Sequence, residues 1–339
     1  MTSSISSSEA VSDPGMASEW RRWLLAFLSV PLLGGALLLA FLIAVDPYDT
    51  GKFGVLGIDG VDDQNTRTAI PSRARDPQFN AAVIGNSTVQ RLDPTRLSQA
   101  TGLRFVQLYM IGASPHEELA VLDLFVRSHP RPRALVIGAD PSWCVHDHSD
   151  AGRFPYWLYD RSFFVYAARL MSWQGVEHAF QRLAIGLGLR QRKVVDGFFD
   201  YEELWPPPFR NDNRPRDPPP AATDAERELF PAIALLDAAI KRLPPEVPVV
   251  LLVPPTFHTT VPQPGSPGAR EREACNAALA RVVAGRPHSN FINYRVDNEL
   301  TRNAENFADF IHYRGIIADK ISDGIVASLR LGAAAKIDF

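Results

Sequence analysis

The residues best suited to chemistry are a serine at position 87 and a carboxylate–imidazole pair near the end of the chain. Residues 83–87 form an apolar run that ends in Gly-Asn-Ser, which predicts a serine hydroxyl at the carboxyl end of a buried strand. Asp309 and His312 stand three positions apart, just before the last helical segment. A histidine activates a serine by taking its proton, and a carboxylate fixes the histidine tautomer. Ser87, His312 and Asp309 are therefore a candidate triad.

Each of the three also has a structural interpretation. Gly-Asn-Ser is ordinary turn chemistry, and Ser87 could simply cap the helix that follows it. Asp309 could be a turn residue, and His312 a surface histidine. The occurrence of all three in one chain, at the two ends of an α/β pattern, favours the catalytic interpretation.

An alternation of strands and helices positions these residues. Short apolar strands are expected at 81–84, 105–109, 134–137, 247–253 and 291–294, and helices at 115–127, 225–242, 269–284 and 315–331. Continuously apolar strands separated by helices predict an α/β fold, a parallel sheet between two layers of helices. In such sheets ligands bind at the carboxyl ends of the strands, where Ser87 is expected.

The chain begins with a predicted membrane anchor. Residues 24–45 carry no charge, and at about 1.5 Å per residue they span about 33 Å, enough for a bilayer. We expect residues 1–22 to be a disordered cytoplasmic tail, 23–45 a transmembrane helix and 46–78 an extended linker. Arg21-Arg22 before the apolar run favours a cytoplasmic tail and an exported body. A cleavable signal peptide and a buried core helix are the disfavoured alternatives.

Within the body, 79–339, residues 141–223 interrupt the alternation and are rich in aromatic side chains. They are expected to form a helical insertion with a small core of its own, or a cap whose aromatic faces line a groove for a sugar or acyl chain. Cys144 and Cys275 allow either one disulfide or two buried thiols, and two thiols are the favoured interpretation.

Composition argues against some partners. The net charge of −3 gives no reason to expect nucleic acid. His116, His146, Asp147 and His148 form a dense polar group, but adjacent residues rarely point to one ion, so no metal site is expected. No cofactor is expected either.

This layout of strand-turn-serine and Asp-x-x-His resembles the SGNH (GDSL-like) hydrolase superfamily. It is most similar to membrane-anchored members tied to O-acetylation of exported polysaccharides or to esterification of cell-wall polymers. The resemblance covers roughly residues 80–330 apart from the insertion. It implies an SGNH/flavodoxin-like fold and a single-pass protein of the bacterial inner (cytoplasmic) membrane, with its domain on the periplasmic side. It also implies a polysaccharide or acyl-ester substrate and a membrane-bound acyltransferase as a partner.

Carried over residue by residue, the resemblance makes Ser87 the nucleophile, His312 the general base and Asp309 its orienting partner. The oxyanion donors would be the Ser87 region and Gly112, which follows the second strand. The family usually has an asparagine after the third strand, where this chain has Asp140, and an ionised carboxylate there would repel an oxyanion.

Asn86 is therefore a further candidate donor, and Asp140 and His258 are expected near the cleft. Two classes of function follow: a serine esterase or O-acyltransferase acting on a glycan, or a non-catalytic relative that binds polysaccharide or scaffolds an acylation complex. The intact Ser, His and Asp favour the first, and Asp140 keeps the second open.

Overall fold

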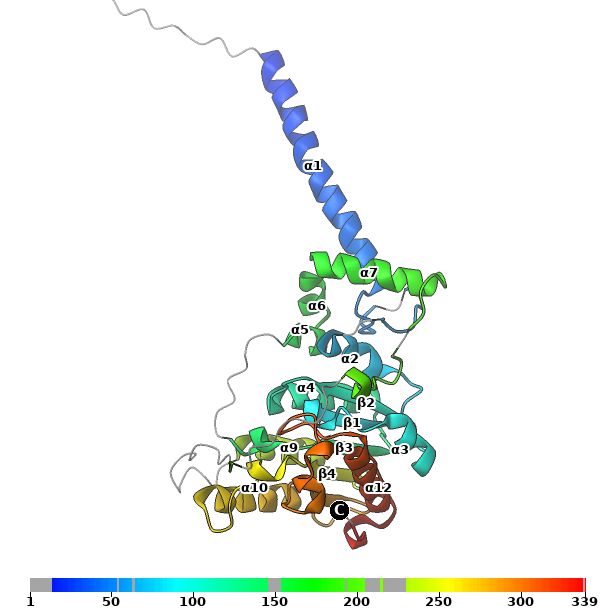
Figure 1. Cartoon of the computed structure of the whole chain (residues 1–339). Helices are drawn as coiled ribbons and strands as arrows, with labels where there is room; N and C mark the ends of the chain where they lie inside the picture. The colour runs from blue at the N-terminus through cyan, green and yellow to red at the C-terminus, as the bar shows by residue number, and fades with distance from the viewer. Residues whose placement is uncertain are drawn as a thin grey trace, which may run out of the picture.

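The computed structural model describes residues 14–53, 55–62, 65–145, 154–192, 194–204, 214–215, 230–337 and 339. A long N-terminal helix projects from an α/β body (Figure 1). The sheet consists of β1 (Ala81–Asn86), β2 (Phe105–Met110), β3 (Ala134–Gly138), β4 (Val249–Val253) and β5 (Asn290–Asn293).

All four strand pairings are parallel, and the strand order is β2-β1-β3-β4-β5. The predicted parallel α/β sheet is confirmed. After β1 the chain adds β2 on one side and then returns to add β3 on the other side. Order 2-1-3-4-5 is that of flavodoxin-like sheets, which bind ligands at the switch point beyond β1 and β3. Ser87, the residue after β1, therefore lies at the switch point.

Helices cover both faces of the sheet. One face carries α4 (Pro115–Ser128), α9 (Pro231–Lys241) and α10 (Pro267–Val283), and the other carries α3 (Pro94–Thr101) and α12 (Gly315–Leu331). Neighbouring strand residues point to opposite faces, so Ile84 joins the first core and Val83 the second. The shorter helical segments are η1 (Ser87–Val89), η2 (Pro141–Cys144), η3 (Glu202–Leu204), η4 (His258–Thr260), α11 (Glu299–Arg302), η5 (Ala304–Asn306) and η6 (Gly332–Ala334).

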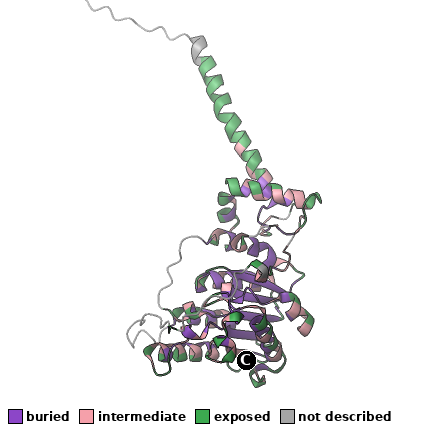
Figure 2. Cartoon of the chain, in the orientation of Figure 1, coloured by how far each residue is buried: buried purple, intermediate pink, exposed green. Residues whose placement is uncertain are grey.

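The N-terminal helix α1 (Pro14–Val45) is exposed along most of its length (Figure 2). From Ser18 it is long and apolar enough to cross a membrane, with a mean hydropathy of 2.5. The prediction of a disordered tail over 1–22 is wrong for residues 14–22, which are helical. Pro14 suits a first helical position, and Met16, Ala17 and Glu19, which come soon after it, are good helix formers. Residues 1–13 lie outside the described residues.

The prediction of an extended linker over 46–78 is also wrong, because Thr66–Arg75 form helix α2. The Asn65 side chain caps its first turn by accepting a hydrogen bond from the Arg67 N–H. The helix packs against α4 and β2 and buries Ile70 in the core. Tertiary burial therefore overrides Pro71, which marks a helix breaker in the sequence.

The aromatic insertion contains α5 (Tyr156–Tyr159), α6 (Phe163–Leu170) and α7 (Trp173–Gly186). The prediction of a helical insertion is met over these ranges, but the insertion does not bury a separate core. Tyr166 and Leu170 are fully buried in the same cluster as Leu42 and Val45 of α1. Residues 146–153, 193, 205–213 and 216–229, and with them the start of the helix predicted at 225, lie outside the described residues.

A buried ion pair joins α7 to the end of α1. The Arg182 guanidinium donates to the carbonyls of Val45 and Asp46, and it contacts the Asp49 carboxylate at 2.7 Å. Asp49 also accepts hydrogen bonds from Ser72 and Arg75. A cation is favourable at a helix C-terminus, where unpaired carbonyls gather. Burial raises the pKa of Asp49, while the charges of Arg182 and Arg75 oppose that shift.

Replacing Arg182 with methionine is expected to lower the free energy of unfolding by about 3–5 kcal/mol. The change leaves the buried Asp49 with Arg75 as its remaining cation, and it removes the donor shared by the Val45 and Asp46 carbonyls. Since burial raises the pKa of Asp49, acidification should protonate it and recover part of the loss. Denaturant unfolding of the full chain in detergent, followed by circular dichroism, measures both effects. Lys241→Gln breaks the exposed pair with Asp237 and should cost less than about 1 kcal/mol. Equal effects of the two changes would contradict a structural role for Arg182.

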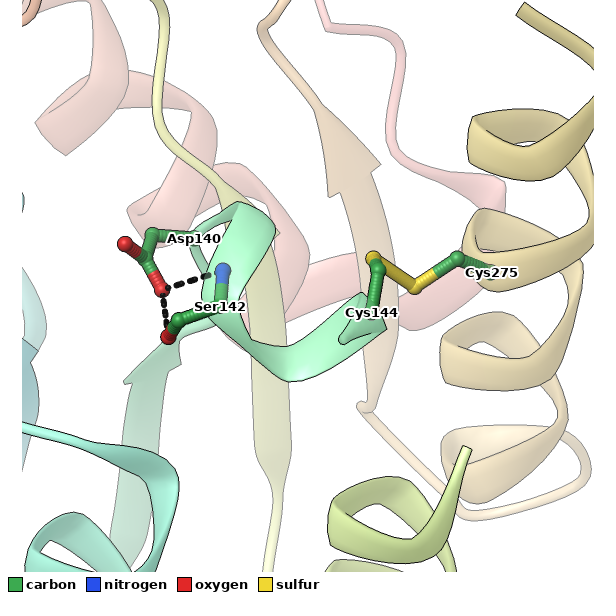
Figure 3. Close-up of a disulfide and its surroundings, with 4 residues drawn as sticks. All are labelled: Asp140, Ser142, Cys144 and Cys275. Carbon is green, nitrogen blue, oxygen red and sulfur yellow. Dashed lines mark hydrogen bonds between the residues drawn. A yellow bond between two sulfur atoms is a disulfide. The ribbon is translucent and has the colours of Figure 1, made fainter. Parts of the chain in front are cut away.

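Cys144 and Cys275 form a disulfide, with 5.7 Å between their Cα atoms (Figure 3). The bond ties η2, which follows β3, to α10. The favoured interpretation of two free thiols is therefore wrong. The two cysteines are 131 residues apart, so only the packing of α10 beside the end of β3 reveals that they meet.

Candidate active site

The structure brings together Ser87, His312 and Asp309. The Ser87 Oγ lies 2.9 Å from Nε2 of His312, and the other ring nitrogen, Nδ1, lies 2.7 Å from Oδ2 of Asp309. Ser87 and His312 are 225 residues apart in the sequence. With Nδ1 donating to the carboxylate, Nε2 accepts the serine proton, which is the arrangement a general base requires.

The loop that carries Asp309 and His312 is held in place by its own backbone. Oδ1 of Asp309 accepts hydrogen bonds from the N–H groups of Ile311 and His312, at 2.7 and 2.8 Å. Burial alone would raise the pKa of Asp309, but the hydrogen bonds from the His312 ring and from these two N–H groups lower it to about 2. Asp309 is therefore ionised at neutral pH and orients the imidazole.

A tight turn presents Ser87 at the end of β1. Oδ1 of Asn86 accepts hydrogen bonds from the Thr88 N–H and hydroxyl, at 3.0 and 2.7 Å, and so caps η1. Val89 then folds back over the strand ends, where a Cβ on Gly85 or Gly138 would lie within 2.8 Å of its methyl groups. Both positions therefore require glycine. In the described residues the Asn86 amide nitrogen makes no hydrogen bond, so it is available to a bound oxyanion.

Gly112 lies beside this turn, at the end of the neighbouring strand. Register pairs Asn86 of β1 with Met110 of β2, so Gly112 follows two residues beyond that pair. Its φ of 60° lies in the left-handed region, which favours glycine. The position at the carboxyl edge fits the predicted oxyanion donor, and the donation itself stays a prediction.

Asp140 extends β3 at the same edge, since register pairs Ile84 with Ile137. Its side chain turns onto its own helix, η2, where Oδ1 accepts hydrogen bonds from the Ser142 N–H at 3.1 Å and from the Ser142 hydroxyl (Figure 3). Asp140 therefore serves as a helix cap, which explains an aspartate at this position without catalysis.

A second carboxyl group is buried near Asp140. Glu118 of α4 is 1% exposed, and its Oε2 accepts a hydrogen bond from the Trp143 ring N–H at 3.2 Å. Burial, and after it the negative charge of Asp140, raise the pKa of Glu118 well above its usual value. Burial therefore favours the neutral form of Glu118, and sequence reasoning did not single this residue out.

The structure does not show a contact between His258 and the triad. His258 begins η4 after β4, and its Nδ1 lies 3.9 Å from the Asp297 carboxylate. Its ring packs edge-to-face on Phe257. Among the described residues, no group of three or more His, Cys, Asp or Glu side chains is placed to hold a metal ion. His146, Asp147 and His148 lie outside that part of the chain.

Glu202 from the aromatic insertion supports the site, and sequence reasoning missed it. Its carboxylate accepts hydrogen bonds from Arg91, Arg314 and the N–H of Gly315, at 2.7, 3.1 and 3.0 Å. Arg314 and Gly315 directly follow the His312 loop, and Arg91 follows η1. Glu202 therefore links the segment after Ser87 to the segment after His312. It lies 112 residues from Arg314, and no local pattern in the sequence predicts this contact.

No model of a known protein family matches the chain, and no curated protein matches it. The geometry holds a serine, a histidine and a carboxylate in a hydrogen-bonded chain at the switch point of a parallel sheet. This is the arrangement that acyl transfer through a covalent serine intermediate requires.

Proposed function

We propose that the chain is an exported, membrane-anchored serine esterase or O-acyltransferase of the SGNH type that acts on a glycan. The observation that supports this most is the pair of contacts from His312, at 2.9 Å to the Ser87 hydroxyl and 2.7 Å to the Asp309 carboxylate. A histidine without a catalytic role would not require a serine hydroxyl on one ring nitrogen and a carboxylate on the other. Their meeting where a doubly wound sheet binds its ligands favours a catalytic role.

The proposed reaction has two steps. The Ser87 Oγ attacks the acyl carbonyl while its proton passes to Nε2 of His312, and the tetrahedral oxyanion is held by N–H groups near Ser87, Asn86 and Gly112. Collapse of this intermediate breaks the ester bond, and His312 returns the proton to the departing oxygen. Water or a sugar hydroxyl then attacks the acyl-serine, loses its proton to His312, and releases Ser87.

Three observations support an exported location. Helix α1 is long and apolar enough to span a bilayer, and Arg21-Arg22 precede its apolar stretch. The disulfide between Cys144 and Cys275 is typical of proteins that fold in an oxidising compartment. We therefore place the body on the periplasmic side of a bacterial cytoplasmic membrane, where a membrane-bound acyltransferase would be a natural source of acyl groups for a transferase.

Trapping the acyl-enzyme tests the proposal. The purified full chain, mixed briefly with an activated acetyl ester and quenched in acid, should carry one acetyl group on the peptide that contains Ser87. Mass spectrometry of the digested protein locates that group. Acetylation of lysines only, at the same level in Ser87→Ala, would count against the acyl-enzyme.

The alternative is a non-catalytic protein that binds polysaccharide or scaffolds an acylation complex. One observation favours it: Asp140 caps η2 at the position where the SGNH resemblance expects an asparagine donor. Losing one oxyanion donor typically costs about 10²-fold in rate. A binding protein can therefore keep the hydrogen-bonded triad and still turn over no ester.

Replacing Asp140 with asparagine separates the two. For an esterase, asparagine keeps a cap for η2 and adds an amide donor, so turnover of an acetyl ester should stay equal or rise by up to about 10²-fold. Asp140→Ala, which removes the cap and adds no donor, is the matched control and should not raise turnover. If wild type, Asp140→Asn and Ser87→Ala all show one background rate over a range of acyl esters, the binding protein becomes the better proposal.

A further inference from the structure

Exposed apolar side chains gather in residues 163–189 of the insertion. Phe164, Trp173 and Leu189 are 81%, 82% and 78% exposed. Phe163, Val165, Met171, Phe180 and Leu187 belong to the same group. Large apolar side chains so open to water, grouped on one segment, mark a surface that meets something apolar.

In α7 the apolar residues form one stripe. They stand at positions 173, 176, 180 and 183, with Leu187 following at the C-cap, which is the spacing of one helix face. The buried Ala179 and Arg182 lie on a different face, toward the body. Gln174 and Glu177 are exposed on the remaining side. Val176 packs partly against the core, whereas Trp173, Phe180 and Leu187 of the same stripe are exposed, so the stripe extends well beyond the face that α7 buries in its own domain.

This stripe faces the side from which α1 leaves the body. Phe180 packs its ring on Phe41 of α1, with 5.7 Å between ring centroids. Helix α7 lies crosswise at the base of α1, and α6 lies next to it (Figure 1). The exposed apolar residues of the insertion thus belong to the segment that packs on the base of α1, a helix that is itself exposed along most of its length (Figure 2).

The position of Phe41 along α1 matches a membrane boundary. Trp20 and Trp23 pack together near the start of the apolar stretch, as aromatic residues do at one membrane surface. From Trp23 to Phe41 the helix rises about 27 Å at about 1.5 Å per residue, close to the hydrocarbon thickness of about 30 Å. Beyond Phe41, Leu42 and Val45 are buried in the body. The second boundary therefore falls at the level of α7.

The junction fixes α7 at that level. Arg182 reaches from the buried face of α7 to the last carbonyls of α1 and to Asp49. The Tyr166 hydroxyl of α6 donates to the Asp46 carboxylate at 2.6 Å, directly after α1. Both helices are thus bound to the membrane helix by buried polar contacts, and no flexible linker separates them from it.

We propose that α6 and α7 lie in the bilayer surface on the side of the body, with Phe164, Trp173, Phe180 and Leu187 inserted at the boundary of headgroups and acyl chains. This inference rests on the proposed membrane anchoring of α1. The partner is the lipid itself, and the contact holds the α/β domain in one orientation against the membrane.

Quenching of tryptophan fluorescence by brominated lipid tests the contact of α6 and α7 with the bilayer surface, which we call the platform. The full chain is reconstituted in phosphatidylcholine vesicles brominated either near the headgroup or near the end of the acyl chain. The emission of Trp173 is obtained as wild type minus Trp173→Phe, and that of Trp23 as wild type minus Trp23→Phe. Leu331→Trp, at an exposed position on the end of α12, supplies a matched probe on the body.

We expect Trp173 to lose most of its emission in lipid brominated near the headgroup and less in lipid brominated at the chain end, while the tryptophan at 331 is unaffected. Quenching of Trp23 without quenching of Trp173 would overturn the platform and leave the anchor standing. If the lipid quenches neither Trp23 nor Trp173, the anchor and the platform are both overturned. Acylation of Ser87 does not enter this measurement, so the proposed chemistry is judged separately.

Discussion

Ser87→Ala is expected to lower the turnover of an acetyl ester by about 10⁴- to 10⁶-fold, because the proposed acyl intermediate forms on the hydroxyl that His312 contacts. His312→Ala should cause a loss of the same order, since the serine hydroxyl then has no base. The double variant should be no slower than either single variant, because the two residues act as one unit. Steady-state turnover of the purified chain measures all three rates.

His288→Ala is the matched control for His312→Ala. His288 is exposed and lies just before β5, at the opposite end of the sheet from the triad. Its removal loses a ring contact with the Arg330 carbonyl and places alanine at a φ of 51°, a local cost far from the triad, so turnover should stay within about twofold. Wild-type turnover in Ser87→Ala would refute the triad. A loss in His288→Ala equal to that in His312→Ala would show that the effect comes from general unfolding.

Removal of the disulfide is expected to lower the free energy of unfolding by up to about 5 kcal/mol. Cys144 and Cys275 close a loop of 131 residues, and a cross-link over so long a loop restricts the unfolded chain strongly. The paired change Cys144→Ala with Cys275→Ala keeps both side chains small and apolar. Denaturant unfolding in detergent, with and without reductant, gives the difference.

Reductant should destabilise the wild type and leave the paired variant unchanged. A wild type whose stability does not respond to reductant, and whose two thiols both react with an alkylating reagent before reduction, would contradict the bond. It would also remove one of the three observations that favour an exported body. The triad would be judged separately, because its hydrogen bonds join Ser87, His312 and Asp309 and do not involve the disulfide.

Local chemistry explains which parts of the site could be predicted. Asp309 and His312 lie three residues apart, so a short loop is enough to bring the carboxylate to the ring. Ser87 follows an apolar run that forms a strand, and ligands of parallel sheets bind at the carboxyl ends of the strands. These are short-range patterns, and they predicted three of the residues that meet.

The remaining parts depend on contacts between distant segments. Glu202 reaches Arg314 from a segment of the insertion that has no pattern of its own. The SGNH resemblance places Asp140 where an asparagine oxyanion donor is expected, but the structure shows that the Asp140 side chain caps η2. Residues 66–75 contain a proline and few apolar residues, yet they form a buried helix because α4 and β2 provide a surface for it.

The sequence by itself determined five apolar strands, the helices α4, α9, α10 and α12, a long apolar N-terminal segment, and the order Ser, Asp, His. Hydrophobic periodicity and turn residues act over a few positions, so one chain reveals them. Only the tertiary structure decided the strand order, the disulfide over 131 residues, and the contact of Ser87 with His312 over 225 residues. Such pairings depend on which surfaces pack best in the whole fold, and this information is spread over the chain rather than held in any local pattern.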